Sequence, residues 1–477
     1  MRQTEGKKRL FCVCHLGFRG DACEKRDETA CFNGCSGRGM CVRGFCSCQM
    51  GFFGIDCSID LDAASEAQAR TDPIAELDMP EGDSALATLL ANASTGAAFV
   101  NSRALEVPPE ARQELFRPRV YVYELPPWVA QSLDLQRLTP LNDAYSAYAT
   151  VLALLLRDNA TRTHDPWEAN LFYVPAFAYA YSSNTGSPHE HVRRVLRFIR
   201  AEYPALWARR GGRDHLVWAT GDRGICPLPA DLANLIWLVH YAPEHVEKGS
   251  GASFPLDSGA DPLDASATGT CFRPEHGIVM APEKRMNARA RATYGPDAEQ
   301  LPRDTLLFFA GDARPTDPHY SQGVRQRLFQ LFNNTAATDI LFARRVPDMD
   351  RVMRSSKFCL APTGHGWGTR LGLAMVNGCV PVIIQDGVHQ VYDDLLPYDA
   401  FSVRIPQAEL GKLEARLRAI PPAKLRVLQH GVRRFHRAFL WPQPGEPEAE
   451  RGRDAYYCFL KSLQLRVRAV LAGFHHR

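Results

Sequence analysis

The stretch that most constrains the fold of this chain runs from Ser356 to Asp386, SKFCLAPTGHGWGTRLGLAMVNGCVPVIIQD. The apolar segments at 357–361 and 380–384 suit buried parallel strands, and residues 371–376 between them suit a short helix. Glycines punctuate the loop that precedes this helix. The order of strand, glycine loop, helix and strand predicts an α/β unit with its ligand at the carboxyl ends of the strands.

The loop and helix start have the composition of an anion site. Glycines let backbone N–H groups approach a bound anion, and a helix N-terminus adds partial positive charge. Arg370, in the first helical turn, offers a bidentate fork to a diphosphate. Asp386 follows the second strand and can bind ligand hydroxyls or order its loop; His365 can contact the ligand or be an ordinary loop residue. The predicted ligand-binding residues of this stretch are Gly364, His365, Gly366, Gly368, Arg370 and Asp386.

The whole stretch closely resembles the nucleotide-sugar half of the exostosin family of glycosyltransferases, in the order SKFCLxPxG, an arginine, an alanine and GCVPVIIxD. The likeness covers roughly residues 119–440, from a YVYELP string at 121–126 onwards. It implies a GT-B fold, in which two Rossmann-type α/β domains face a cleft. It also implies an inverting transfer from a nucleoside-diphosphate sugar. We expect the donor to be a UDP-sugar and expect no metal or other cofactor.

Cysteine usage indicates an oxidising compartment. Nine of the 14 cysteines lie before residue 58, in a glycine-rich segment too short to bury a core without disulfides. A zinc site is the rival, but no histidine lies between Cys23 and Cys57, and the CxC spacing suits zinc poorly. The spacing resembles an EGF-like module, and that resemblance implies the pairs Cys31–Cys41, Cys35–Cys46 and Cys48–Cys57.

The segment before this module repeats its ending. Cys14 can pair with Cys23, whereas Cys12 lacks the upstream partner that the pattern demands. We therefore expect the chain to begin inside an EGF-like repeat, with a signal or membrane anchor in missing upstream sequence. A free Cys12 is the alternative.

The alternation of expected strands and helices after residue 118 predicts parallel-sheet α/β layers. Expected strands lie at 120–125, 171–174, 216–220, 278–280 and 305–311, and expected helices at 145–157, 191–203, 232–240, 424–440 and 456–472. The final helix could cross back onto the first α/β domain. The expected domains are a partial EGF-like repeat (1–25), an EGF-like module (26–58), a flexible linker (59–117), an N-terminal α/β acceptor-side domain (118–300), a C-terminal α/β nucleotide-sugar domain (301–440) and a C-terminal helical segment (441–477).

Net charge and N-glycosylation sequons indicate the cellular compartment and the classes of binding partner. A net charge of +3 over 477 residues gives no support for nucleic-acid binding. Sequons at Asn92, Asn159 and Asn333 support, with the disulfides, a secretory-pathway lumen, expected to be the Golgi, with the extracellular space as the alternative. The expected partners are a nucleotide sugar and a glycan or glycoprotein acceptor, and the EGF-like module offers a surface for a protein partner.

Glycosyl transfer needs a charge stabiliser for the departing diphosphate and a base for the acceptor hydroxyl. Arg314, in the loop after a strand, is a second candidate for the role of charge stabiliser beside Arg370. The alternative is that Arg314 is an ordinary loop arginine. Asp222, in the family-like Asp-x-Gly pattern at a strand end, is the predicted base. The alternative is that it forms a turn or caps a helix. His389 is interpreted as a loop residue.

Two features bear on metal and redox chemistry. Asp348-x-Asp350 looks like a metal-binding DxD motif, but the helical run after it favours a helix N-terminal cap. Cys359 and Cys379 flank neighbouring strands, and two buried free thiols are the preferred interpretation over a disulfide.

One departure from the family matters. Many relatives carry an acidic residue just before the helical alanine, where it can grip ribose hydroxyls, and this chain has Leu373 there. Ribose recognition must then differ, use Asp386 or be lost. The alternative function is therefore an inactive extracellular carbohydrate-binding or adhesion protein.

Overall fold

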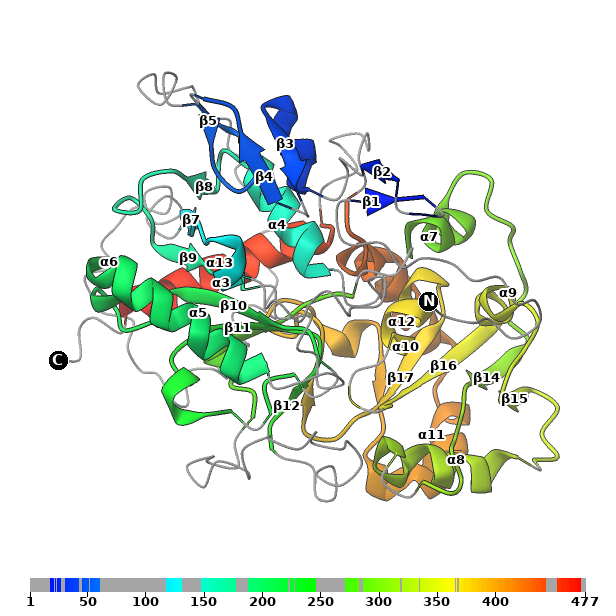
Figure 1. Cartoon of the computed structure of the whole chain (residues 1–477). Coiled ribbons are helices and arrows are strands. Elements are labelled where there is room, and N and C mark those ends of the chain that lie inside the picture. The colour runs from blue at the N-terminus through cyan, green and yellow to red at the C-terminus, as the bar shows by residue number, and fades with distance from the viewer. Residues whose placement is uncertain are drawn as a thin grey trace, which may run out of the picture.

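The computed structural model describes residues 18–20, 22, 24–26, 31–42, 45–50, 52–60, 117–130, 147–176, 188–221, 224–226, 228–245, 271–282, 286–317, 320–333, 335–364, 366, 369–442 and 453–472. A small disulfide-bonded module precedes two α/β layers that lie next to each other, the first drawn in cyan and green and the second in yellow and orange (Figure 1).

The N-terminal module consists of short antiparallel strand pairs closed by disulfides. Its elements are β1 (Phe18–Arg19), β2 (Lys25–Arg26), η2 (Phe32–Gly37), β3 (Gly39–Val42), β4 (Phe45–Cys48), β5 (Phe52–Phe53) and β6 (Ile59–Asp60). The three predicted bonds, Cys31–Cys41, Cys35–Cys46 and Cys48–Cys57, are all formed. The buried half-cystines make up its small core. Cys14 and Cys23 lie outside the described residues.

The first large sheet has six parallel strands in the order β13-β11-β10-β9-β7-β8. Their bounds are β7 (Val120–Val122), β8 (Arg162–Thr163), β9 (Leu171–Tyr173), β10 (His215–Ala219), β11 (Ile236–Val239) and β13 (Gly277–Val279). Every residue of β9, β10 and β11 is buried, because helices cover both faces of a parallel sheet.

The helix predicted at 232–240 is wrong. The structure has a single 3-10 turn, η9 (Ala230–Leu232), followed by β11. The run Ile-Trp-Leu-Val is continuously apolar, and such a short run fits a buried strand as well as a buried helix. Its pairing with β10 and β13 decides between them.

The second sheet has five parallel strands in the order β15-β14-β16-β17-β19. Their bounds are β14 (Thr305–Ala310), β15 (Ile340–Ala343), β16 (Ser356–Pro362), β17 (Val380–Ile384) and β19 (Val403–Arg404). The stretch from Ser356 to Asp386 therefore supplies the central strand, its neighbour and the helix between them. Two parallel α/β sheets agree with the predicted fold class.

Helices flank both sheets. They are α3 (Pro127–Ala130), α4 (Ala147–Arg157), α5 (Pro188–Glu202), α6 (Pro204–Ala208), α7 (Met286–Tyr294), α8 (Val324–Phe332), α9 (Met349–Arg354), α10 (Arg370–Val376), α11 (Leu413–Arg418), α12 (Pro422–Phe435) and α13 (Ala455–Ala472). The last helix, α13, drawn in red in Figure 1, crosses back to the first layer as predicted. Its Tyr456 hydroxyl donates to Asp158 at 3.0 Å, and its Arg466 donates to the Gly277 carbonyl.

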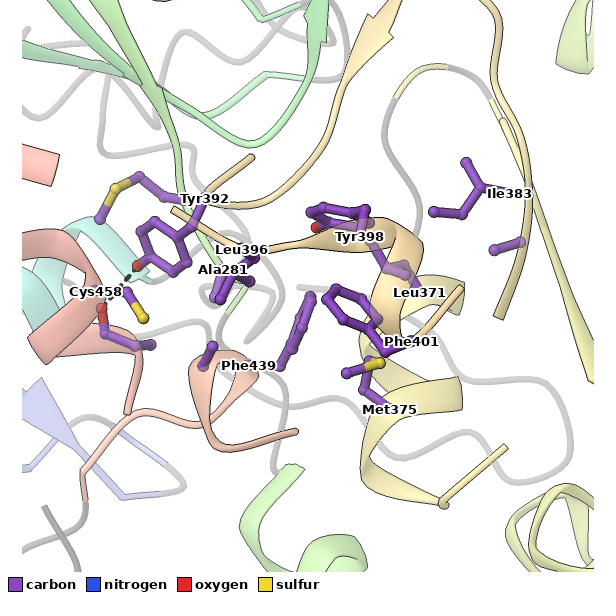
Figure 2. Close-up of a cluster of buried hydrophobic side chains, with 14 of the residues drawn as sticks. Ala281, Leu371, Met375, Ile383, Tyr392, Leu396, Tyr398, Phe401, Phe439 and Cys458 are labelled. Atoms are coloured by element: carbon purple, nitrogen blue, oxygen red, sulfur yellow. Dashed lines mark hydrogen bonds between the residues drawn. The ribbon is translucent and has the colours of Figure 1, made fainter. Parts of the chain in front are cut away.

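The two layers are joined by backbone pairing and by a shared core. β12 (Ala242–Pro243) of the first layer pairs antiparallel with β18 (Val388–His389) of the second. Figure 2 shows the core beside this junction, where Phe439 lies between Ala281 of the first layer and α10 of the second, and Tyr392 lies on the other side of Ala281, near Cys458. The Tyr392 hydroxyl donates to the Ala455 carbonyl at 2.8 Å.

The interpretation of Cys359 and Cys379 as free thiols is corrected, because they form a disulfide. Cys359 lies on β16 opposite Pro381 of β17, and Cys379 immediately precedes β17. Adjacent strands bring their Cα atoms to 5.8 Å, within the range that a disulfide spans. A further disulfide, Cys226–Cys271, links two loops of the first layer, and Cys458 is a buried free thiol.

Within the described residues, no helix has the length and apolarity needed to cross a membrane.

Candidate active site

The glycine loop lies at the carboxyl end of the central strand β16 and leads into α10. Gly366 is buried at φ +130°, a conformation that side chains rarely allow, so the glycine is required there. Ser321 fastens the loop start, with its hydroxyl donating to the Thr363 carbonyl at 2.8 Å and its N–H to the Gly364 carbonyl at 3.0 Å. His365 and Gly368 lie outside the described residues, so their predicted contacts stay predictions.

Arg370 is a half-buried cation without a described counter-charge. Its guanidinium lies over the Phe309 ring at 5.5 Å and donates to the Met349 sulfur at 3.4 Å. Among the described residues, no carboxylate forms an ion pair with it. Burial, with the nearby positive charge of Arg325, lowers the pKa of Arg370 to about 10. A bound anion would stabilise the charged form of Arg370, since burial of an unpaired charge costs free energy.

Arg325, on α8, is the second member of this cluster and was not predicted from the sequence. Only 6% of it is exposed. Its Nε donates to the Thr363 carbonyl at 2.8 Å, and its Nη1 donates to the Asp312 carbonyl at 3.2 Å and to the Tyr320 hydroxyl at 2.7 Å. These bonds tie the glycine loop to the loop after β14. A sequence signal existed, since Arg325 directly follows Val324 on the buried face of α8.

Arg314 completes the cluster from the exposed side. Its guanidinium stacks on the Tyr320 ring at 4.4 Å, and Arg325 lies 5.1 Å from the same ring. A side-chain carbon at Gly311 would come within 2.9 Å of the Arg370 guanidinium, so the glycine makes room for it. Three arginines thus converge at the carboxyl ends of β14 and β16, an arrangement suited to a polyanion.

A pocket lies next to this cluster, at the junction of the two layers. The first layer contributes residues after β11 and β13, and the second contributes the start of α10 and the segment after β17. Its lining is His240, Tyr241, Val279, Pro282, Leu371, Gly372, Gln385, Val388, His389, Gln390, Val391 and Phe439. The pocket therefore lies at the carboxyl ends of strands from both sheets, where open α/β folds hold their ligands.

Comparison with known families identifies the protein family to which this site belongs. Residues 116–420 match the model of the Exostosin GT47 domain. The chain belongs to this exostosin GT47 family. It is therefore a glycosyltransferase, and its two parallel α/β layers are those expected of the family.

Curated relatives agree with this assignment. A probable glucuronosyltransferase of Oryza sativa subsp. japonica is 28% identical over 368 residues, covering 73% of this chain and 77% of the relative. A probable beta-1,4-xylosyltransferase of Arabidopsis thaliana, IRX10, is 27% identical over 361 residues, covering 72% and 81%. A solved structure described as the glycotransferase of kitacinnamycin matches at 15% identity, over 73% of this chain and 94% of that one, with a TM-score of 0.24.

The position where many exostosin relatives carry an acid is apolar in structure as well as in sequence. Leu373 is 2% exposed and packs in a cluster with Phe308, Met353 and the Cys359–Cys379 disulfide. This environment offers an acidic side chain no water and little polarity. Leu373 therefore stabilises the packing of α10 on the sheet.

Asp386 orders its loop, one of the two roles predicted for it. It is exposed after β17, and its Oδ2 accepts the Gln407 N–H at 3.0 Å. The predicted base, Asp222, lies outside the described residues. The described residue Gly224 packs against Tyr241, which lines the pocket: a side-chain carbon at Gly224 would come within 2.1 Å of the Tyr241 carbonyl oxygen.

The DxD-like pair has the structural role that was predicted. Asp348 caps α9, its Oδ1 accepting the Arg351 N–H at 3.0 Å. Asp350 pairs with the Arg289 Nε at 2.9 Å and accepts from the Asn377 amide at 3.2 Å. Within the described residues, the one grouping of His, Cys, Asp or Glu close enough to share a metal is Cys31, Cys35 and Cys46, which are in disulfides.

Proposed function

We propose that this glycosyltransferase moves a sugar from a nucleoside-diphosphate sugar, a UDP-sugar, onto a glycan or glycoprotein acceptor with inversion of the anomeric centre. The setting that we propose is the lumen of the secretory pathway, in the Golgi. The six cysteines paired within residues 31–57 support an oxidising compartment.

The observation that carries the proposal is Arg370, a half-buried guanidinium with no described carboxylate partner and with Arg325 beside it. A diphosphate bears the opposite charge and offers the paired oxygens that a guanidinium fork binds. Its negative charge grows as the sugar leaves, so the arginines stabilise the transition state more than the bound donor. The relatives named above, a probable glucuronosyltransferase and a probable xylosyltransferase, also fit a nucleotide-sugar donor.

The test is a screen of nucleotide sugars for hydrolysis and transfer, followed by Arg370→Ala. We expect the variant to lower kcat on the order of 100-fold, as the loss of one preorganised charge stabiliser does. Nucleoside-diphosphate affinity, measured by calorimetry, should fall in parallel but less. Arg370→Lys should recover only part of the loss, since lysine restores the charge without the fork.

Arg327 provides the matched control. It is an exposed arginine on α8, bonded to Gln330, and its replacement by alanine should leave both quantities unchanged. A protein that binds no nucleoside diphosphate at millimolar concentration would refute the proposed donor. Equal turnover by the wild type and Arg370→Ala would refute the placement of the diphosphate alone.

A further inference from the structure

A histidine–aspartate pair stands in the pocket between the two layers. His389, on β18, brings its Nδ1 to 2.9 Å from the Asp393 Oδ2. The same carboxylate oxygen accepts the Gln390 N–H at 3.2 Å, which fixes its direction. When Nδ1–H donates to Asp393, the other ring nitrogen, Nε2, keeps its lone pair.

The Nε2 atom of His389 lies where the two halves of the enzyme meet. The backbone of His389 pairs with Ala242 of the first layer, and its ring lies 5.3 Å from the Phe272 ring of that layer. The pocket that His389 lines also receives Leu371 and Gly372, the two residues that follow Arg370 on α10. A sugar whose diphosphate binds Arg370 would thus lie near the imidazole.

The charges around the ring suit a group that accepts a proton during reaction. Burial alone would lower the pKa of His389, but Asp393 and then Glu244 raise it, against a smaller opposing effect of Arg404. The net pKa lies above the usual histidine value. Glu244 Oε1 lies 3.6 Å from Nε2 and can pair with the imidazolium once it forms.

We propose that His389 is the general base of the transfer, with Asp393 as its positioning residue. This inference rests on the proposed function and gives His389 the role that the sequence assigned to Asp222. The acceptor hydroxyl passes its proton to Nε2 as its oxygen bonds to the anomeric carbon. The bond from that carbon to the diphosphate breaks, and its electron pair leaves with the diphosphate. Solvent then removes the proton from the imidazolium.

The test compares His389→Gln with Asp222→Ala and with His430→Gln, which changes an exposed histidine on α12. We expect His389→Gln to lower kcat for transfer on the order of 100- to 1,000-fold, as loss of a general base does. Its affinity for UDP should stay within about twofold of the wild type, because Arg370 is retained. His430→Gln should match the wild type. Wild-type transfer by His389→Gln, or a large loss in Asp222→Ala alone, would overturn the assignment.

The pH dependence of the transfer rate distinguishes a general-base role of His389 from a purely structural one. The wild-type rate should rise with pH through the raised pKa of His389, since the neutral ring is the active form. Asp393→Asn removes the stronger raising partner and should move this limb to lower pH, and Glu244→Gln should move it less in the same direction. An unshifted limb in Asp393→Asn would overturn the proposal even if His389→Gln failed to fold. Absence of nucleotide binding in the wild type would instead refute the proposed function.

Discussion

At the scale of single residues, Arg325 organises the anion site without needing to touch the anion. Its guanidinium donates to oxygens of three segments: the glycine loop, the loop after β14 and Tyr320. Hydrogen bonds from charged groups contribute about 1.5–3 kcal/mol each. The pocket for Arg370 therefore depends on Arg325 for its shape as well as for its positive charge.

We expect Arg325→Lys to fold but to weaken UDP binding about tenfold, because an ammonium group cannot reach all three oxygens at once. Arg325→Ala should also lower the free energy of unfolding by about 3 kcal/mol or more, since it leaves buried oxygens unsatisfied. Calorimetry and urea denaturation would measure the two effects. Arg327→Lys, on the same helix, is the control; wild-type affinity in Arg325→Lys would contradict the role.

The residues of the site differ in how readily the sequence discloses them. Arg370 could be predicted because it follows a glycine loop within a distinctive string. Arg325 was missed because its function depends on oxygens supplied by Asp312, Tyr320 and Thr363, and only the fold brings these together. His389 was interpreted as a loop residue for a similar reason, since its partner in the opposite layer is distant in the sequence.

At the scale of elements, α9 begins at the pair Asp348-x-Asp350, which could be interpreted from the sequence either as a helix cap or as a metal-binding DxD motif. Asp348 accepts the Arg351 N–H as an N-cap, and Asp350 is engaged by Arg289 and Asn377. Both carboxylates thus have structural partners. We infer that donor turnover does not depend on a metal bound by this pair.

Asp348→Ala should lower the free energy of unfolding by about 1 kcal/mol, the usual cost of losing an N-cap, with little effect on kcat. Turnover should also persist in excess EDTA. Thermal unfolding and a donor-hydrolysis assay with and without chelator would check both expectations. Loss of activity in EDTA that manganese restores, together with a large fall in kcat in Asp348→Ala, would contradict this inference.

The sequence predicts elements better than it predicts their neighbours. The strands around β14, β16 and β17 were placed because each is an apolar run bounded by turn residues. β11 was mistaken for a helix because four apolar residues show no period that separates the two structures. The preference for free thiols at Cys359 and Cys379 was wrong because their disulfide requires β16 and β17 to be adjacent, which is a property of the whole sheet.

At the scale of the whole molecule, the N-terminal module is docked on the first α/β layer. Asp56 and Arg162 form a buried ion pair at 3.7 Å, and the Arg162 Nη1 donates to the Ser58 hydroxyl at 2.7 Å. Close by, the Ile55 N–H donates to a Glu124 carboxylate oxygen at 3.3 Å. The blue module lies above β7, β8 and α4 in Figure 1. It is therefore attached through specific polar contacts in addition to the chain that links it.

We expect Glu124 to make this docking depend on pH. Burial raises the pKa of Glu124 to about 7, and this effect exceeds the opposing influence of Arg162 and of the Ile55 N–H. A carboxyl with a raised pKa stays protonated in the docked state when the undocked one is already ionised. Its contribution to docking is therefore complete at acidic pH, and it is lost as the pH rises toward and through 7.

We expect amide hydrogen exchange across the interface, at residues 52–60 and 120–124, to be slower at pH 5.5 than at pH 8 once intrinsic exchange rates are corrected. Glu124→Gln is always neutral, so it should keep the slow exchange at both pH values. Asp56→Asn should speed exchange at both, because it leaves Arg162 buried without its ion-pair partner. Equal pH dependence in the wild type and Glu124→Gln would mean that another group controls the docking.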